Sequence, residues 1–387
     1  MAVEKLTFLY IYICLCIIIF TILFSIYVKW QSKVSKKHKQ VLRELLTVPS
    51  GDQEVQQHLK QQLLNKLKKI AYLTAFHETL LELEAEKVHV DWMMLGEVMS
   101  ELAYQHPYRQ VEKKAYFAHV IYFLDLNQRM KSDTPQAHAM RARLSQCVMA
   151  YAWEDSIYIR ENALKAIISL GIEEDVLKVL SILDQQEDVC REKVVQDHLL
   201  NFTGSHQVLA DSLYQNLGKF MPTTQVAIVN YLRLLPKGCI QHEHYWKGFY
   251  ELLSDEKKDK EIRLALIRYF KKYIYSPVRT TLMQYVQCVD EDKWEFAVVA
   301  AMSLEGYEGE EEEDVLVQAL TSSNWYLRLN AAESLVNKGY SYQEIAGNRL
   351  DDYATDMIAY RIQIKAMQKR KAIQEIKAMQ EGKVVEG

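Results

Sequence analysis

Four arginine residues recur in similar sequence contexts, and their guanidinium groups are the side chains best suited to binding an anion. They are Arg160, Arg191, Arg263 and Arg328. Because a guanidinium can pair with two phosphate oxygens at once, such a series could form a phosphate-binding stripe. Each arginine, however, directly follows an apolar residue or a cysteine at the start of a helical pattern. This placement favours structural pairing within a repeated fold over ligand binding.

His242 and His244 are the one tightly spaced histidine pair. Residues two apart on a helix point about 200° away from each other, so both rings could bind one metal ion only on a loop. The HExxH spacing, which places two histidines on one helix face, is absent. We therefore interpret both as surface histidines beside Gly238 and expect no metal.

The acidic run Glu310–Asp314 is typical of the first turn of a helix, where carboxylates face unsatisfied backbone N–H groups. We expect these side chains to be solvated. Contact with a basic partner or a cation is the alternative.

Motifs of nucleotide-binding and hydrolytic sites are absent from the sequence. There is no P-loop, no G-x-G-x-x-G and no G-x-S-x-G. None of the six cysteines falls in a C-x-x-C pair, so they predict small buried apolar residues in a reducing compartment rather than disulfides or a zinc site. We expect no enzyme activity and no cofactor.

The composition is that of a helical protein. Of the 387 residues, 49% are hydrophobic and 25% are charged, and there are only six prolines and 13 glycines. Good helix formers dominate the long segments, which predicts an all-α fold. A net charge of −4 gives no reason to expect nucleic acid as a partner.

Residues 6–28 carry no charge and predict a transmembrane helix. As a helix this stretch is roughly 35 Å long, enough to cross a hydrocarbon core of about 30 Å. Tyr10, Tyr27 and Trp30 suit the two membrane interfaces. A cleaved signal peptide is the alternative, but the apolar run is too long and no A-x-A-like site follows it.

Positive residues cluster after this stretch and predict its orientation. Lys5 alone precedes it, whereas Lys33, Lys36 and Lys37 belong to a lysine-rich segment that follows. Because positive loops stay on the cytoplasmic side, we expect a single-pass protein of the cell membrane with its N-terminus outside and its C-terminal part in the cytoplasm. The same lysines could also bind anionic headgroups.

We divide the chain into an anchor with its flanks (1–30), a basic juxtamembrane segment with an amphipathic helix or helical pair (31–88), helical repeats (89–341) and a C-terminal part (342–387). The helical segment within 31–88 could cap the first repeat or self-associate as a coiled coil. The C-terminal part could cap the repeats or touch the membrane or a partner as a basic amphipathic helix.

Glycines and polar turns punctuate residues 90–340 at regular intervals. Residues 158–163 (YIRENA) match residues 326–331 (YLRLNA) nearly position by position, and the two segments run on to Gly171 and Gly339. Intervals of 10 to 18 residues suit one helix of a stacked pair, and such pairs need neighbours on both sides to bury their apolar faces.

This pattern resembles HEAT repeats, most specifically at residues 157–203 and 310–339. The resemblance implies an α-solenoid of helix pairs that follows the single transmembrane helix. It also implies that Asp155, Asp188 and Asn324 serve as turn residues, and that the arginines form a ladder between repeats: Arg160, Arg191, Arg263 and Arg328.

We expect a membrane-anchored scaffold or adaptor that binds protein partners on the solenoid surface, with the lipid bilayer contacted through residues 6–28. Similar bacterial proteins accompany membrane glycosyltransferases, so an accessory subunit of such an enzyme is a narrower hypothesis. The alternative is a HEAT-like enzyme, a DNA glycosylase or lyase, with its site on the concave face. Trp153, Trp246, Trp294 and Trp325 suit either a partner interface or inter-helix packing.

Overall fold

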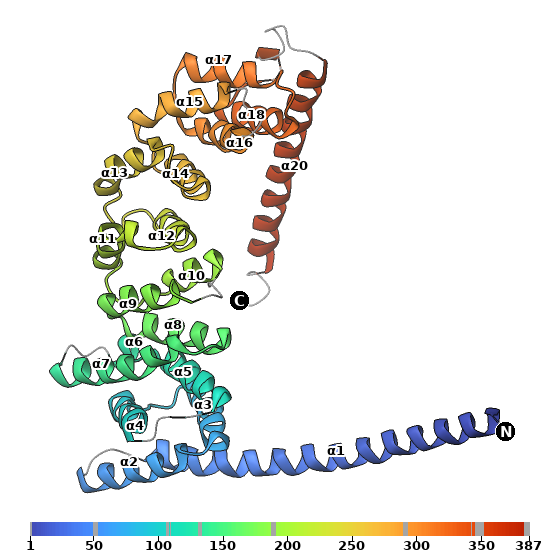
Figure 1. Cartoon of the computed structure of the whole chain (residues 1–387), viewed down its shortest axis with the longest axis vertical. Helices are drawn as coiled ribbons and strands as arrows, with labels where there is room; N and C mark the ends of the chain where they lie inside the picture. The colour runs from blue at the N-terminus through green and yellow to red at the C-terminus, as the bar shows by residue number, and fades with distance from the viewer. Residues whose placement is uncertain are drawn as a thin grey trace. The chain divides into compact units, whose positions relative to one another are not determined.

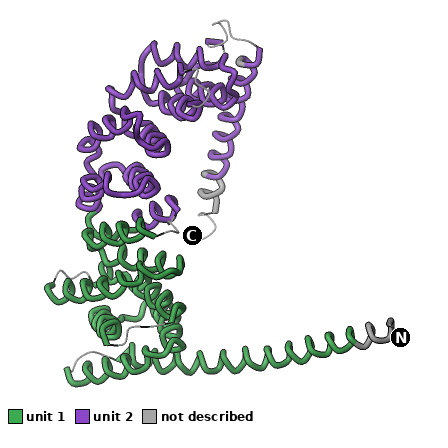
Figure 2. The backbone as a smooth tube through the Cα atoms, viewed as in Figure 1, with its two compact units in different colours: residues 1–190, 201–205 green, residues 191–200, 206–387 purple. Residues whose placement is uncertain are grey.

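The computed structural model describes residues 2–48, 53–105, 108, 110–130, 134–186, 191–288, 293–341, 343–344 and 352–382. Throughout these residues the regular secondary structure is helical, and no strand occurs (Figure 1). The prediction of an all-α protein is confirmed. The chain divides into two compact units, residues 1–190 with 201–205 and residues 191–200 with 206–387 (Figure 2).

The first unit contains the N-terminal helices. In order they are α1 (Ala2–Leu46), α2 (Gln53–Leu67), α3 (Ile70–Ala85), α4 (Trp92–Gln105), α5 (Val111–Leu124), α6 (Leu126–Met130), α7 (Pro135–Met149), the 3₁₀ turn η1 (Ala150–Trp153), α8 (Ile157–Leu170) and α9 (Glu173–Leu183). Helix α1 packs on α3, α3 on α5 and α5 on α8, while α2 packs on α4 and α4 on α7. Alternate helices therefore form two rows.

The second unit continues with shorter helices. They are α10 (Glu192–Leu199), α11 (His206–Gln215), α12 (Pro222–Leu234), α13 (Glu243–Ser254), α14 (Lys260–Lys272), α15 (Arg279–Gln287), α16 (Trp294–Ser303), α17 (Glu310–Ala319), α18 (Trp325–Lys338) and α20 (Asp352–Gly382), with 3₁₀ turns at Leu217–Lys219, Ser276–Val278 and Leu304–Gly306. Each even-numbered helix from α10 to α18 packs on the next, and α18 packs on α20. We call α10, α12, α14, α16 and α18 the inner row.

Burial distinguishes the inner row from the helices that cover it. On α12 every residue from Thr224 to Leu232 is buried. On α13, which packs on the inner helix α14, only Tyr245, Phe249 and Leu253 are buried, spaced four apart on one stripe. A stripe of this kind is the pattern of a surface helix, whereas burial on all sides requires neighbours on all sides.

Local sequence signals set several helix ends. The Asn324 side chain accepts a hydrogen bond from the Leu327 N–H (3.2 Å) and caps α18. Gly171 and Gly339 follow α8 and α18 with φ of 70° and 102°, a left-handed conformation that glycine adopts without steric cost. The predicted glycine terminators at these two positions are confirmed.

One carboxylate of the acidic run departs from the prediction of a solvated helix start. Glu310, Glu311 and Glu313 lie in the first turn of α17 as expected, but Glu312 is completely buried. It pairs with Arg279 at the start of α15, whose Nη2 lies 2.8 Å from Glu312 Oε2. The expectation is wrong for this residue because its partner comes from the preceding helix pair.

Replacing Arg279 with alanine should lower the free energy of unfolding by about 3 kcal/mol, because it leaves the Glu312 carboxylate buried without a cation. Chemical denaturation followed by circular dichroism measures this change. Glu311 is the matched control: it also pairs with Arg279 (3.1 Å) but is exposed, so Glu311→Ala should cost below about 0.5 kcal/mol. Equal effects of the two substitutions would contradict the assignment.

Candidate functional site

Three of the four predicted arginines occupy the same place in their helices and make the same kind of contact. Arg160, Arg263 and Arg328 are each the fourth residue of α8, α14 and α18. Arg160 donates to the carbonyl oxygens of Glu154 (3.2 Å) and Asp155 (3.3 Å). Arg160 therefore stabilises the turn before its own helix, and Arg263 and Arg328 stabilise the turn or helix end before theirs.

Arg263 donates from Nε to the Leu253 carbonyl oxygen (3.1 Å), and Arg328 donates from Nε to the Ser322 carbonyl oxygen. Arg263 also reaches the next helix pair, where its Nη2 donates to the Tyr285 hydroxyl (2.7 Å). These bonds occupy the guanidinium groups with backbone and side-chain oxygens of the fold. The structure therefore offers no continuous arginine stripe for phosphate.

The remaining predicted turn and ladder residues differ among themselves. Arg191 is exposed and precedes α10 as its N-cap residue, so it does not share the register of the other three arginines. Asp155 is exposed and lies one position before Ser156, the N-cap of α8, whereas Asn324 is itself the N-cap of α18. Asp188 lies outside the described residues.

A second set of side chains, which sequence reasoning missed, links successive inner helices through backbone carbonyl oxygens. Except for Lys365, which lies near the middle of α20, these donors lie in the last turns of their helices or just after them, and each reaches the preceding inner helix or its C-terminal end. They are Tyr273 to Leu235 (3.1 Å), Ser303 to Ile267 (3.3 Å), Tyr307 to Phe270 (3.2 Å), Ser334 to Ala301 (2.8 Å) and Lys365 of α20 to Val336 (2.8 Å). The two serines are 31 residues apart and the two tyrosines are 34 residues apart, and this regular spacing could have identified them in the sequence.

Helix α1 joins the apolar stretch to the folded part of the first unit without a break (Figure 1). Its apolar part is long enough to span a membrane, with a mean hydropathy of 2.8, and none of it is buried in the protein. Its last turns, in contrast, bury Leu42 and Leu46. One helix therefore serves both an apolar exposed segment and a packed core.

Ion pairs stabilise the packing of α1 on α3. Lys39 lies 2.9 Å from both Glu78 and Glu82, and Arg43 Nη1 lies 3.0 Å from Glu86 Oε1. These pairs, together with the buried leucines, fix the position of the end of α1 within the first unit.

The predicted membrane-interface residues all lie on α1 and are exposed. Tyr10, Tyr27 and Trp30 expose 69%, 53% and 61% of their surface, and the rings of Tyr27 and Trp30 lie 6.3 Å apart. Lys33, Lys36 and Lys37 follow on the same helix and are exposed too. All six side chains are therefore accessible to the surroundings of the protein.

His242 is buried, so the prediction of two surface histidines is wrong for this residue and holds for His244 alone. Its ring stacks on Tyr273 (3.5 Å between ring centres) and its Nδ1 lies 3.0 Å from the Tyr269 hydroxyl. Burial, helped by the charge of Lys272, lowers the pKa of His242 to about 4. His242 is therefore a neutral core residue at neutral pH.

The cysteines also depart from the expectation of full burial. Cys16 is exposed, and Cys14, Cys147, Cys239 and Cys288 are half-buried. All five described cysteines carry free thiols, in agreement with the absence of a disulfide framework in the sequence.

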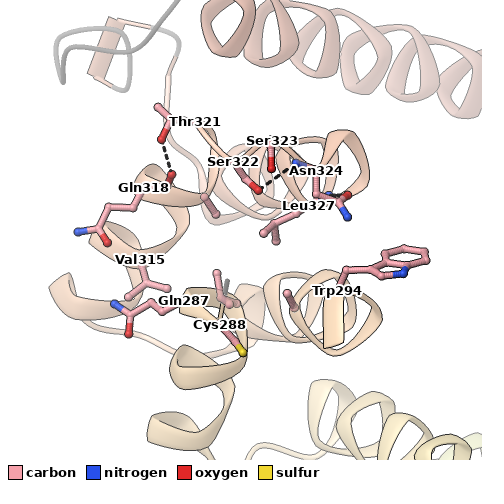
Figure 3. A pocket seen from close by; sticks show the side chains of 13 residues that line it. Gln287, Cys288, Trp294, Val315, Gln318, Thr321, Ser322, Ser323, Asn324 and Leu327 are labelled. Atoms are coloured by element: carbon pink, nitrogen blue, oxygen red, sulfur yellow. Dashed lines mark hydrogen bonds between the residues drawn. The ribbon is translucent and has the colours of Figure 1, made fainter. Parts of the chain in front are cut away.

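A pocket of about 740 Å³ opens in the second unit between the C-terminal ends of α15 and α17 and the first turns of α16 and α18. Gln287 and Gln318 lie at one end and Trp294 at the other, with Val315 and Cys288 between them (Figure 3). Its lining is uncharged, and its volume lies within the range of about 300–1,000 Å³ that is typical of ligand sites.

Exposed aromatic rings border this pocket. Trp294 stacks on Tyr326 with 5.7 Å between ring centres, and Trp325 meets Tyr326 edge-on at 5.4 Å. The three rings expose 39%, 46% and 56% of their surface in the order Trp294, Trp325, Tyr326. We call these three residues the aromatic group. Rings preassembled in this way are typical of protein interfaces because they bury a large area at little entropic cost.

No protein family model matches this chain, and no curated protein sequence matches it. Within the part of the chain that the structure describes, no group of three or more histidine, cysteine, aspartate or glutamate side chains is placed to hold a metal ion. The function is therefore inferred from the geometry of the chain's own residues.

The low pKa of His242 predicts a pH dependence of stability. The unfolded chain takes up a proton at its ordinary pKa of 6.5, whereas the folded chain resists protonation down to about 4. Above pH 6.5 His242 is neutral in both states and does not lower the free energy of unfolding. As the pH falls to about 4, the unfolded chain is protonated first, and the free energy of unfolding decreases by roughly 3 kcal/mol.

Urea denaturation from pH 7 to pH 4 measures this loss as a difference between the wild type and His242→Gln, because the variant lacks the group that titrates. The exposed His244 provides the matched control, and His244→Gln should retain the wild-type pH dependence. A wild-type slope in His242→Gln would contradict the assignment.

Proposed function

We propose that this protein is a membrane-anchored scaffold whose folded part lies in the cytoplasm and binds a protein partner. The observation that carries the proposal is the continuity of α1 from an exposed apolar segment into a packed core. A signal peptide removed by cleavage would have no reason to continue as the helix that completes the core of the first unit.

The orientation is supported by the charges that flank the apolar stretch. Lys5 precedes it, whereas Lys29, Lys33, Lys36 and Lys37 follow within ten residues. Because positive residues are retained on the cytoplasmic side, α1 is expected to leave the membrane into the cytoplasm.

We also propose that the helix pairs stack as a HEAT-like solenoid within each unit. Three observations support this arrangement: the inner row in which each helix packs on the next, the arginine repeated at the fourth position of α8, α14 and α18, and the recurring bonds from Tyr, Ser and Lys side chains to the preceding inner helix. Repeats of this kind stabilise one another through nearest-neighbour contacts.

The aromatic group and the pocket beside it are the surface best suited to a protein partner. A cluster of two tryptophans and a tyrosine matches the residue types that dominate binding energy at interfaces. The neutral amides of Gln287 and Gln318 add hydrogen-bonding capacity without the desolvation cost of a charge.

Anchoring can be tested directly by fractionation. The full chain should remain in the membrane pellet after washing with alkaline carbonate, whereas a variant that lacks residues 2–28 should move to the soluble fraction and still give a helical circular dichroism spectrum. This result follows because residues 29–46 keep their packing on α3. Release of the full chain by carbonate would contradict the proposal.

Partner binding can be tested by photo-cross-linking in membranes. A photoreactive residue placed at Tyr326 should give a discrete adduct with one protein, because Tyr326 belongs to the aromatic group. The control position is Tyr104 in the first unit, which is 85% exposed and lies outside the aromatic group. Adducts of the same pattern at both positions would contradict a specific interface.

Truncation of Trp325 to alanine should reduce the Tyr326 adduct by about tenfold or more, since loss of an aromatic hot spot costs about 2 kcal/mol or more. Trp153→Ala removes a tryptophan of similar exposure (53%) in the first unit and serves as the matched control. An undiminished adduct in Trp325→Ala would exclude the aromatic group from the interface.

A further inference from the structure

Two lysine clusters that are distant in the sequence meet at the base of the first unit. One is Lys29, Lys33, Lys36 and Lys37 on α1, and the other is Lys66 and Lys69 at the turn between α2 and α3. We call these six residues the basic collar. Five of them are exposed, and Lys66 is half-buried.

Ring contacts bring the two clusters together. The Tyr72 ring of α3 stacks on the His38 ring of α1 with 3.9 Å between ring centres. Lys66 Nζ lies over the same Tyr72 ring, 5.2 Å from its centre. Burial and then the charges of Lys66, Lys37 and Lys69 lower the pKa of His38, in keeping with these ring contacts.

The collar lacks acidic partners, unlike the next basic residues along α1. Lys39 is paired with Glu78 and Glu82 of α3, and Arg43 with Glu86, the residue that follows α3. None of the six collar lysines forms an ion pair with an acidic side chain of the described residues. The first acidic residue after the apolar stretch is Glu44. Within the described residues, no acidic side chain therefore neutralises the collar.

Membrane topology accounts for only one of the two lysine clusters, the one on α1. The positive-inside effect counts lysines within about 15–20 residues of a membrane span. Lys66 and Lys69 lie much farther along the chain, so insertion does not require them, yet the fold places them against α1.

The collar extends from the headgroup zone of a bilayer to the outer limit of the electric field of that zone. His38 follows Val28, the end of the apolar stretch, by about 15 Å along the helix. The headgroup zone extends roughly 7 Å beyond the hydrocarbon, and the field of its charges reaches about 8 Å farther at physiological ionic strength.

We infer that the basic collar binds the anionic phospholipid headgroups of the bilayer that α1 crosses, with Lys66 and Lys69 as a second contact besides the lysines of α1. This inference rests on the proposed membrane anchoring. A second contact away from the helix axis resists rotation of the first unit about α1, which a single helix does not.

The test uses the full chain in lipid nanodiscs, either purely zwitterionic or with about one third phosphatidylglycerol, an anionic lipid that attracts lysines. Lysines are modified with an amine-reactive reagent and quantified by mass spectrometry. Lys66 and Lys69 should react about threefold more slowly in anionic nanodiscs, and the difference should disappear in about 0.5 M salt, where screening is strong. The exposed Lys257 in the second unit should react equally in both.

A charge-reversal variant tests the link between the two clusters. In Lys66→Glu/Lys69→Glu, the protection of Lys36 and Lys37 by anionic lipid should fall by about half or more, because the second contact is lost. Lys257→Glu/Lys258→Glu carries the same change in net charge and should retain it.

Equal reaction rates of Lys66 and Lys69 in the two kinds of nanodisc would overturn the inference, whatever the variants do. Failure of the chain to enter either nanodisc would instead contradict the anchoring itself. The two failures are therefore distinguishable.

Discussion

The second unit depends on helices that are apolar on nearly every side. Helix α12 buries nine consecutive residues, from Thr224 to Leu232, and an isolated helix of this composition would expose all of them. Polar groups within this stretch must find partners inside the protein. Gln225 does so by donating to the Phe220 carbonyl oxygen (2.6 Å). Helix α12 therefore folds only as part of a row, and the row extends until a helix with a polar face ends it.

Helix α20 meets that requirement in its first half. Ile358 is fully buried, Arg361 lies 2.8 Å from Glu333 of α18, and Arg328 lies over the Tyr353 ring at 4.7 Å. From Lys365 to Glu375 the side chains are exposed. The helix thus covers the end of the inner row and then continues past it, so the interpretation as a cap fits its first half, while contact of its second half with a membrane or a partner stays a prediction.

The sequence predicts well those features that depend on residues close together in the chain. The all-α class and the glycine ends at Gly171 and Gly339 both follow from local composition and spacing. The burial of Glu312 does not, because Arg279 lies 33 residues away and nothing in the acidic run singles out its third member.

The same limit applies to the candidate sites. The tryptophans of the aromatic group are visible in the sequence, but the association of Trp294 with Tyr326 depends on how α16 and α18 pack. The basic residues at positions 66 and 69 look like an ordinary solvated turn until α3 is placed against α1. Packing between distant segments, which propensity does not encode, decides these cases.

The unbroken course of α1 has a mechanical consequence. A protein tethered by a flexible linker is indifferent to the angle of its anchor, whereas a stiff helix transmits that angle to whatever is fixed at its end. Residues 29–46 span about 27 Å, so a tilt of about 20°, which is ordinary for a helix in a bilayer, displaces the far end sideways by about 9 Å. Since tilt responds to the match between apolar length and bilayer thickness, the proposed anchoring of α1 in a membrane would couple the orientation of the first unit to the thickness of that membrane.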